Sequence, residues 1–207
     1  MAGILTISAS PSARSKTAGI RRLVDERLTG LGHDLSALDV RDLPAAALLA
    51  ADTREPAIAA VLGAFERADG VVVATPVYKA SYSGLLKTLL DLLPQRALAD
   101  KVVLPLATGG SLAHVLVLDY ALRPVLTSLG SPHIVQGHFV LDHAITLHDA
   151  HAELSAEAGD ALYRAVDRFA YALDGTVAAV ASSGSAALGS RGGEHGRVLR
   201  TQETAAA

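Results

Sequence analysis

Residues 71–93, VVVATPVYKASYSGLLKTLLDLL, contain the pattern that decides the fold. The stretch starts with an apolar run at Val71–Ala74, continues through a loop, and ends in a leucine-rich helical pattern at Leu85–Leu93. A second apolar run, VVLPLA, follows at Val102–Ala107. Strands that are apolar on both faces are typical of parallel sheets that helices cover on either side. These residues therefore predict an α/β domain built on a buried parallel sheet.

Strands and helices alternate on both sides of this stretch. Further strands are predicted at Ile4–Ser8, Asp34–Val40 and His133–Leu141. Further helices are predicted at Thr17–Leu28, Glu55–Arg67, Val115–Leu129 and Ala156–Leu173. Five strands joined by helices predict an open, doubly wound parallel sheet with helices on both faces. Because crossover connections are right-handed, the flavodoxin-like strand order 2-1-3-4-5 is favoured.

The composition changes after the last predicted helix. From residue 175 to residue 207 the helical periodicity is lost, and Gly, Ser and Ala dominate. A segment of this kind buries too little apolar surface to offset the entropy lost on ordering it. We therefore expect one flavodoxin-like domain at residues 1–174 and a flexible tail at residues 175–207.

The composition also excludes several classes of protein. The 207 residues include no cysteine, which rules out thiol catalysis, cysteine-ligated zinc and iron–sulfur clusters. A formal net charge of −3 argues against a nucleic-acid-binding protein, which usually carries a basic face. No apolar run approaches the ~20 residues of a membrane span, and the opening MAGILTIS lacks the basic leader of a signal peptide. We expect a cytoplasmic protein that binds neither nucleic acid nor membrane.

The first candidate loop, SASPSARSKT at Ser8–Thr17, has the features of an anion site. Ligands of doubly wound sheets bind at the carboxyl ends of the strands, so the loops after strands one, three and four are the candidates. This loop combines several hydroxyl groups with Arg14 and Lys16 at the start of a predicted helix, where free N–H groups and the helix dipole favour a phosphate. It matches neither GxxxxGK[ST] nor GxGxxG, which disfavours ATP hydrolysis and Rossmann-type dinucleotide binding. The alternative is an ordinary serine cap with exposed cations.

The second and third loops offer backbone groups to a planar ligand. In ATPVYKASYSG, residues 74–84, the Thr75-Pro76 pair predicts an extended turn that exposes the backbone of residues 77–79. In ATGGSLAH, residues 107–114, the paired glycines permit positive φ and a close approach of the backbone to a ligand. The alternative for the second loop is that its tyrosines cover helix ends or pack a subunit contact. The alternative for the third loop is a tight turn without a ligand.

In combination, three segments resemble the NADPH-dependent FMN reductases. They are SASPSARSKT, ADGVVVATPVYKASYSGLLKTLLDLLP and KVVLPLATGGSLAH…DYALRPVL, and the similarity extends from Ile4 to Leu141. It is strongest to the alkanesulfonate-utilisation branch, whose members supply reduced flavin to a separate monooxygenase. The resemblance implies FMN and NADPH as cofactors, with NADH as an alternative donor. It also implies a flavin-dependent monooxygenase as partner and a homo-oligomer, either a dimer or a tetramer.

The resemblance further implies which residues hold the flavin. The FMN phosphate would be bound by Ser10, Arg14, Ser15, Lys16 and Thr17. One edge of the isoalloxazine would be bordered by Thr75, Pro76, Val77, Tyr78 and Lys79. The other edge would be bordered by Thr108, Gly109, Gly110 and Ser111.

Two tyrosines are assigned to a subunit interface or to flavin release. Tyr120, in DYALRP, resembles a tyrosine that the sulfonate branch carries in a π-bulged fourth helix at a tetramer interface, a feature linked to release of flavin. Tyr82 is assigned the same kind of role. The alternative for Tyr120 is simple packing against a neighbouring helix, and Pro124 would itself kink a helix here.

The predicted reaction is hydride transfer from NAD(P)H to FMN. The flavin carries the redox chemistry, so we expect binding residues and no catalytic acid or base. The alternatives are an FMN-containing quinone, azo or metal-ion reductase, and a non-enzymatic electron carrier of the flavodoxin type. No metal site is predicted, because His143, His148 and His151 lack a tight HxxxH spacing with a nearby carboxylate. The pair Arg21–Arg22 is interpreted as a solvated helix face.

Overall fold

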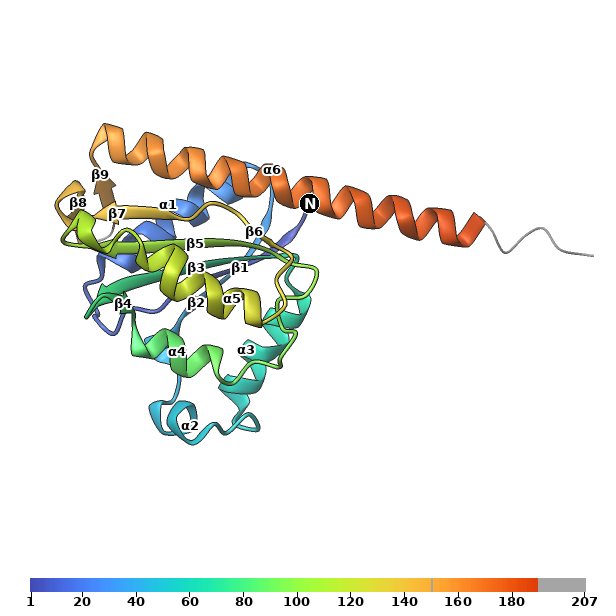
Figure 1. Ribbon diagram of the computed structural model, residues 1–207, viewed down its shortest axis with the longest axis horizontal. Coiled ribbons are helices and arrows are strands. Elements are labelled where there is room, and N and C mark those ends of the chain that lie inside the picture. Colours follow the sequence, from blue (N-terminus) through green and yellow to red (C-terminus); the bar gives the residue numbers. More distant parts are fainter. Residues whose placement is uncertain (150, 190–207) are drawn as a thin grey trace, which may run out of the picture.

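The computed structural model describes residues 1–149 and 151–189, which form a sheet between two layers of helices (Figure 1). The main strands are β1 (Gly3–Ser8), β2 (Asp34–Asp39), β3 (Gly70–Tyr78), β5 (Val102–Gly109), β6 (His133–Ile134) and β7 (His138–Leu141). Their order is β2-β1-β3-β5-β6, with β7 also pairing with β5, and each of these pairings is parallel. The short strand β4 (Ser81–Tyr82) pairs antiparallel with β3. The predicted flavodoxin-like strand order is therefore confirmed.

Helices cover both faces of the sheet. One face is covered by α1 (Lys16–Gly30) and α6 (Ala156–Gly189). The other is covered by α2 (Ala45–Ala50), α3 (Pro56–Arg67), α4 (Gly84–Leu90) and α5 (Arg123–Ser128). The connections include the 3-10 turns η1 (Val40–Asp42), η2 (Leu112–His114) and η4 (Asp142–Ala144), and the π-helix η3 (Leu118–Leu122). A separate antiparallel hairpin is formed by β8 (Ile145–Leu147) and β9 (Ala152–Leu154).

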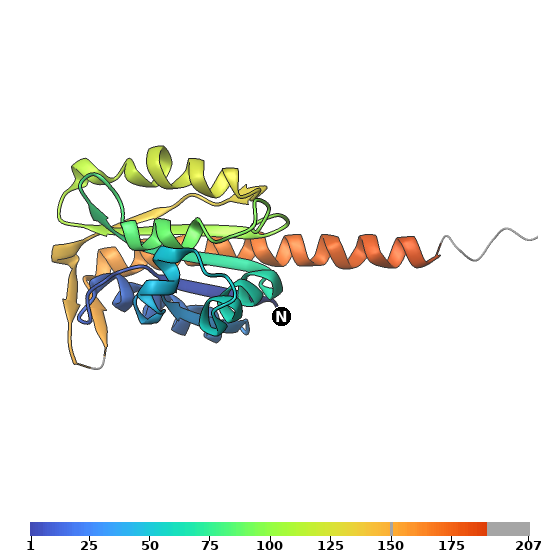
Figure 2. The ribbon, with the colours of Figure 1, turned by 90° about the horizontal axis from the view of Figure 1, so that it is seen from below.

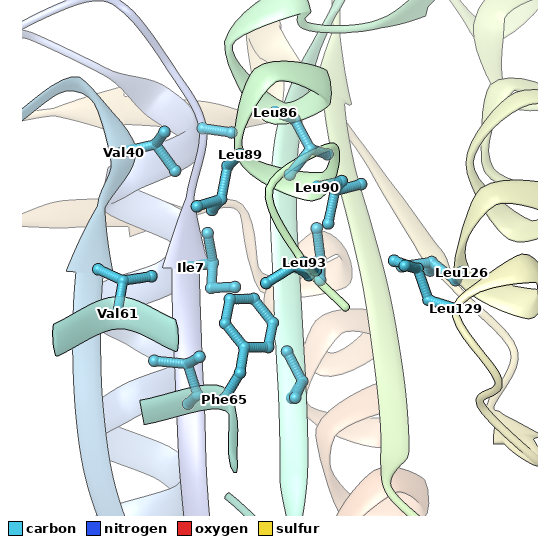
Figure 3. Close-up of a cluster of buried hydrophobic side chains, with 14 of the residues drawn as sticks. Ile7, Val40, Val61, Phe65, Leu86, Leu89, Leu90, Leu93, Leu126 and Leu129 are labelled. Carbon is cyan, nitrogen blue, oxygen red and sulfur yellow. The ribbon is translucent and has the colours of Figure 1, made fainter. Parts of the chain in front are cut away.

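The VVVA run supplies side chains to two separate hydrophobic cores. Val71 and Val73 belong to the core beneath α3, α4 and α5. Val72 and Ala74 belong to the core beneath α1 and α6, because successive side chains of a strand point to opposite faces. Figure 3 shows the first core, in which Phe65 lies among side chains from the sheet and from α3 and α4. The sheet is therefore buried on both faces, as its apolar sequence predicts.

The fifth strand was predicted as continuous from residue 133 to residue 141, and this was wrong. The register against β5 shifts by one residue between β6 and β7, at a gap opposite Pro105. The carbonyl of Val103 accepts a hydrogen bond from Val135, and strand residues two apart face the same neighbour. An N–H at position 105 would therefore point toward β6 and β7. Proline has no N–H to donate, and the hydrogen-bond ladder breaks at this position. Gly137 fills the gap because a Cβ there would lie 2.9 Å from the Pro105 carbonyl oxygen.

Helix α6 is longer than the sequence predicts. It was expected to end at Leu173, with a flexible tail from residue 175, but it continues to Gly189 and extends past the sheet (Figures 1 and 2). The predicted end of this helix was therefore wrong, and residues 190–207 of the predicted tail lie outside the described part of the chain. Alanine has the highest helix propensity, and adding a turn to an existing helix avoids the cost of nucleation. Within the described residues, no helix is both long and apolar enough to cross a membrane.

Candidate functional site

The three candidate loops lie at the same edge of the sheet and are joined by hydrogen bonds. Ser83 Oγ donates to the carbonyl oxygen of Ala9 at 2.7 Å, which links the second loop to the first. Thr17 Oγ1 and Thr108 Oγ1 lie 2.7 Å apart, which links the first loop to the third. The parallel register explains this convergence, because Ser8 pairs with Ala74 and Thr75 pairs with Ala107. The predicted placement of the loops is borne out.

Ser83 is a positioning residue that the sequence analysis missed. Its side chain is buried, and its Oγ also accepts from the backbone N–H of Leu86 at 3.1 Å, capping α4. Its own N–H donates to Thr75 Oγ1 at 3.0 Å. A serine directly before the helical pattern GLLKTLL was the available signal, since serine is a preferred N-cap.

The first loop has the donor chemistry that a phosphate monoester requires. Ser15 caps α1 by accepting from Ala18 at 3.1 Å, and the first turn of this 15-residue helix carries no acidic side chain. The first N–H groups of a helix have no intrahelical partner, and the dipole makes them attractive to anions. Ser10 is buried and accepts from the N–H of Ser12, while Arg14 is exposed. The buried Ser8 hydroxyl has no hydrogen-bond partner among the described residues.

Two residues assigned to the phosphate are also engaged within the fold. Lys16 Nζ donates to the carbonyl oxygen of Asp142, which ties the first loop to η4. Thr17 is buried and shares one hydrogen bond with Thr108, so one of the two hydroxyl hydrogens stays available. These side chains hold the loop in place, and the roles of Ser10, Arg14, Ser15, Lys16 and Thr17 toward a ligand stay predictions.

The second loop is mostly a β-hairpin and not the extended turn that was predicted. β3 continues through Pro76 to Tyr78, because the extended conformation that proline imposes on Thr75 suits a strand. The chain reverses at Lys79 and Ala80, whose φ angles are 49° and 60°. Two adjacent residues with positive φ form the tight turn of a hairpin, a conformation that costs energy in residues other than glycine. Strain of this kind tends to occur at functional sites.

The side chains of the second loop face different environments. Thr75 is fully buried and donates to the carbonyl oxygen of Pro76 at 3.0 Å, so it holds the backbone in place. Val77 is partly buried, and 48% of Tyr78 is exposed. Pro76 pairs in register with Thr108, which brings the second and third loops side by side.

The third loop uses its two glycines differently. Neither glycine has a positive φ, so the positive φ that the sequence led us to expect does not explain why glycine occurs at these two positions. A Cβ on Gly109 would lie 2.9 Å from the ring of Phe139, so packing requires this glycine. A Cβ on Gly110 would meet nothing closer than Asp142 Oδ2 at 3.9 Å. Ser111 caps η2 by accepting from Ala113 at 3.2 Å.

A π-helix follows the third loop, as the resemblance implies. It spans Leu118–Leu122, where a continuous helix from residue 115 to residue 129 was expected, and 79% of Tyr120 is exposed. Pro124 lies directly after the π-helix, and the helical backbone continues without a break from Leu118 through Arg123 into α5. Tyr82 is half-buried against the hydrophobic core.

A buried charge network lies behind the first loop. Arg21 is buried and forms ion pairs with Asp25 and Asp39, so its interpretation as a solvated residue was wrong. Burial raises the pKa of the Asp25 carboxyl despite the Arg21 guanidinium beside it. Arg22, one position later, is exposed as expected. Because α1 turns by about 100° per residue, adjacent arginines occupy different faces of the helix.

Comparison with known proteins identifies the family. The family model of the NADPH-dependent FMN reductases matches residues 2–146. The chain is 47% identical over 142 residues to the FMN reductase (NADPH) of Pseudomonas putida, covering 69% of this chain and 72% of that protein. It is 45% identical over 142 residues to the FMN reductase (NADPH) of Escherichia coli, covering 69% and 74%.

The solved structures agree with this assignment. The apo form of the NADH:FMN oxidoreductase EmoB has a TM-score of 0.75 and 43% identity, over 82% of this chain and 88% of that one. A flavodoxin from Streptococcus pneumoniae has a TM-score of 0.54 and 14% identity, over 82% and 97%, and shares the fold. The chain belongs to the NADPH-dependent FMN reductase family.

Proposed function

We propose that this NAD(P)H-dependent FMN reductase releases reduced FMN to a flavin-dependent monooxygenase in sulfonate sulfur assimilation. FMN is then a substrate that leaves as FMNH₂, not a permanently bound group. The proposal places the reaction in the cytoplasm, where reduced pyridine nucleotides are kept.

The π-helix at Leu118–Leu122 is the observation that carries this proposal. It follows directly from the third loop and presents Tyr120 to solvent. π-Helical turns are rare and occur mostly at functional sites. The π-helix contacts β4 and β5, which lead into the second and third loops, so a change in this segment would reach the place where flavin enters and leaves. Relatives named NADH-dependent FMN reductase SfnF in Pseudomonas also favour a reductase that turns over flavin.

The residues of this chain have binding and positioning roles in the proposed reaction. Bound flavin supplies the hydride-accepting chemistry. The start of α1, with Ser10, Arg14 and Ser15, would hold the phosphate. The second and third loops would offer backbone N–H groups to the ring and keep the nicotinamide in contact distance. Ser83, Thr17 and Thr108 keep the three loops in register.

We also propose that the exposed apolar surface around η3 is covered in a homo-oligomer. Leu112, Leu116 and Tyr120 are exposed by 65%, 57% and 79%, and they lie on consecutive turns beside the third loop. Contiguous exposed apolar surface is typical of protein interfaces. Sedimentation of the wild type and of Tyr120→Ser tests this assignment, since the variant is expected to shift toward smaller species.

Steady-state kinetics test the role of FMN. Purified protein is assayed for NADPH and NADH oxidation while the concentration of added FMN is varied. We expect saturation in FMN, and flavin that passes through an ultrafiltration membrane when the protein is retained. A protein that keeps its flavin through filtration and reduces quinones at a rate independent of added FMN would overturn the proposal.

A further inference from the structure

The hairpin formed by β8 and β9 brings together three side chains with metal-binding atoms. Leu147 pairs with Ala152, and the N–H of His148 donates to the carbonyl oxygen of His151 at 2.9 Å. Sequence spacing alone disfavoured a metal site, because these histidines lack a tight HxxxH spacing with a nearby carboxylate in a settled element. The folded hairpin places one beside both histidines, since Glu153 on β9 lies two residues after His151 on the same arm and diagonally opposite His148.

The distances within this cluster are those of a set of ligands. His148 Nε2 lies 3.3 Å from Glu153 Oε2, and His151 Nε2 lies 3.5 Å from Glu153 Oε1. The two imidazole rings are stacked, with centroids 4.6 Å apart and planes inclined by 18°. One candidate ligand atom from each residue lies within 4.8 Å of the other two. Two nitrogen donors and one oxygen donor thus converge on one point of the hairpin.

These distances agree with tetrahedral coordination. Zinc–nitrogen bonds of about 2.0–2.1 Å and zinc–oxygen bonds of about 2.0–2.2 Å place neighbouring ligand atoms roughly 3.3 Å apart. Both histidine–glutamate distances are close to this value, and they involve different oxygens of the Glu153 carboxylate. The two rings are nearly parallel, so one imidazole has to rotate for both lone pairs to meet at the ion. Both histidines are exposed, which leaves room for that rotation.

We propose that His148, His151 and Glu153 bind one divalent transition-metal ion of the Zn²⁺ class, with water completing its coordination. Imidazole ligands favour zinc, nickel and copper, whereas calcium and magnesium prefer oxygen ligands only. The three residues belong to none of the three flavin loops, so the argument for this site does not rest on the proposed function.

The hairpin that carries this site packs against α1 and borders a cavity beside the first loop. β9 packs against α1 so closely that a Cβ on Gly19 would lie 2.7 Å from the Ala152 Cβ. His148 also lines a cavity of about 280 Å³ together with Arg14, Ser15 and Arg22, beside the first loop. A metal that joins the two arms of the hairpin therefore braces the wall of this cavity.

Calorimetric titration with Zn²⁺ tests the site directly. The full chain, free of any histidine tag, is titrated at about pH 7.5, where imidazole is mostly neutral. We expect one equivalent to bind the wild type, and at least a tenfold loss of affinity in His151→Ala and in Glu153→Gln, since removal of even an outer-shell partner costs roughly 10–100-fold. His143→Ala is the matched control, because His143 is exposed but lies outside the cluster, and it is expected to bind like the wild type.

Cobalt spectroscopy on the wild type gives a second readout that does not depend on any variant. Co²⁺ bound by two imidazoles and a carboxylate in a tetrahedral site absorbs visible light far more strongly than hexaaqua Co²⁺. Circular dichroism without metal confirms that each variant is folded. Failure of the wild type to bind one equivalent of either ion would overturn the proposal, and so would equal Zn²⁺ affinity of the wild type, His151→Ala and Glu153→Gln.

Discussion

Thr17 Oγ1 and Thr108 Oγ1 lie 2.7 Å apart although 91 positions separate them in the sequence. Both side chains are buried, and their hydrogen bond joins the start of α1 to the carboxyl end of β5. The first loop and the third loop are therefore held at a fixed separation before any ligand binds. A preorganised site binds more tightly because less ordering entropy is lost on binding.

Removal of either hydroxyl is expected to weaken both the fold and the site. Thr17→Val or Thr108→Val leaves one buried hydroxyl unpaired, which costs about 1–3 kcal/mol of unfolding free energy. The double variant is expected to cost less than the sum of the two single changes, because no orphaned hydroxyl is left. Urea unfolding of the four proteins measures this coupling, and strictly additive costs would rule out the hydrogen bond.

The paired glycines of the third loop are expected to respond differently to alanine. Gly109→Ala places a methyl group against the Phe139 ring and is expected to cost about 1–3 kcal/mol of stability. Gly110→Ala has room and is expected to change stability by less than about 0.5 kcal/mol, while weakening FMN binding. Thermal unfolding and flavin fluorescence separate the two effects. Unchanged FMN affinity in Gly110→Ala would show that the backbone there does not approach the flavin.

The hairpin turn at Lys79–Ala80 is expected to gain stability from glycine. Ala80 has a φ of 60°, and relief of left-handed strain outweighs the entropy that glycine adds to the unfolded chain, for a net gain of roughly 0.5–1 kcal/mol. Ala59→Gly, at an exposed position within α3, is the control and is expected to lose about 1 kcal/mol. Chemical denaturation measures both, and the proposed strain would be contradicted if Ala80→Gly were destabilising.

Stability is expected to fall as the solution becomes mildly acidic. Burial lowers the pKa of His138 on β7, and Arg168 and Arg164 lower it further. The unfolded chain then binds a proton more readily than the folded one. Neutral His138 therefore contributes its full share of the free energy of unfolding above the ordinary histidine pKa, and this share is lost as the pH falls below that value. Unfolding free energies at about pH 7.5 and about pH 5.5 are expected to differ less in His138→Gln than in the wild type. His133→Gln, an exposed histidine on the adjoining strand, serves as the control, and an equal effect of both changes would exclude His138 as the cause.

Local periodicity predicted the layers of this molecule well. The runs at Val71–Ala74 and Val102–Ala107 are apolar because both faces of their strands are buried, and that alone indicates the layer order. The strand order followed from the handedness of the crossovers, and the loop positions followed from the strand order.

Features that depend on tertiary partners could not be predicted in this way. Arg21 and Arg22 look alike in the sequence, and only the packing of α1 beside Asp39 makes the first a buried residue. The break in the fifth strand depends on Pro105, which belongs to a different strand. The length of α6 reflects alanine propensity outweighing a Gly- and Ser-rich composition.

The three candidate loops were correctly predicted to meet at one edge of the sheet, but the hydrogen bonds that their side chains form within the protein were not visible in the sequence. Thr75 and Thr17 were assigned to ligand contacts, and the structure shows that each also forms a hydrogen bond within the protein, Thr75 with the Pro76 carbonyl oxygen and Thr17 with Thr108. Ser83 was overlooked although it joins two loops. Hydrogen bonds between residues far apart in the chain have no local signature.

Binding of FMN and riboflavin to Arg14→Ala tests most directly whether the first loop holds the flavin phosphate. Arg14 is exposed at the start of α1, and riboflavin lacks the phosphate that its guanidinium would bind. Arg54→Ala, which changes a highly exposed arginine elsewhere, is the control. We predict that Arg14→Ala weakens FMN binding about tenfold or more, as loss of a charge-assisted hydrogen bond of about 1.5–3 kcal/mol requires, and leaves riboflavin binding unchanged. An equal loss of affinity for both flavins, or no loss for either, would contradict the assignment of this loop to the phosphate.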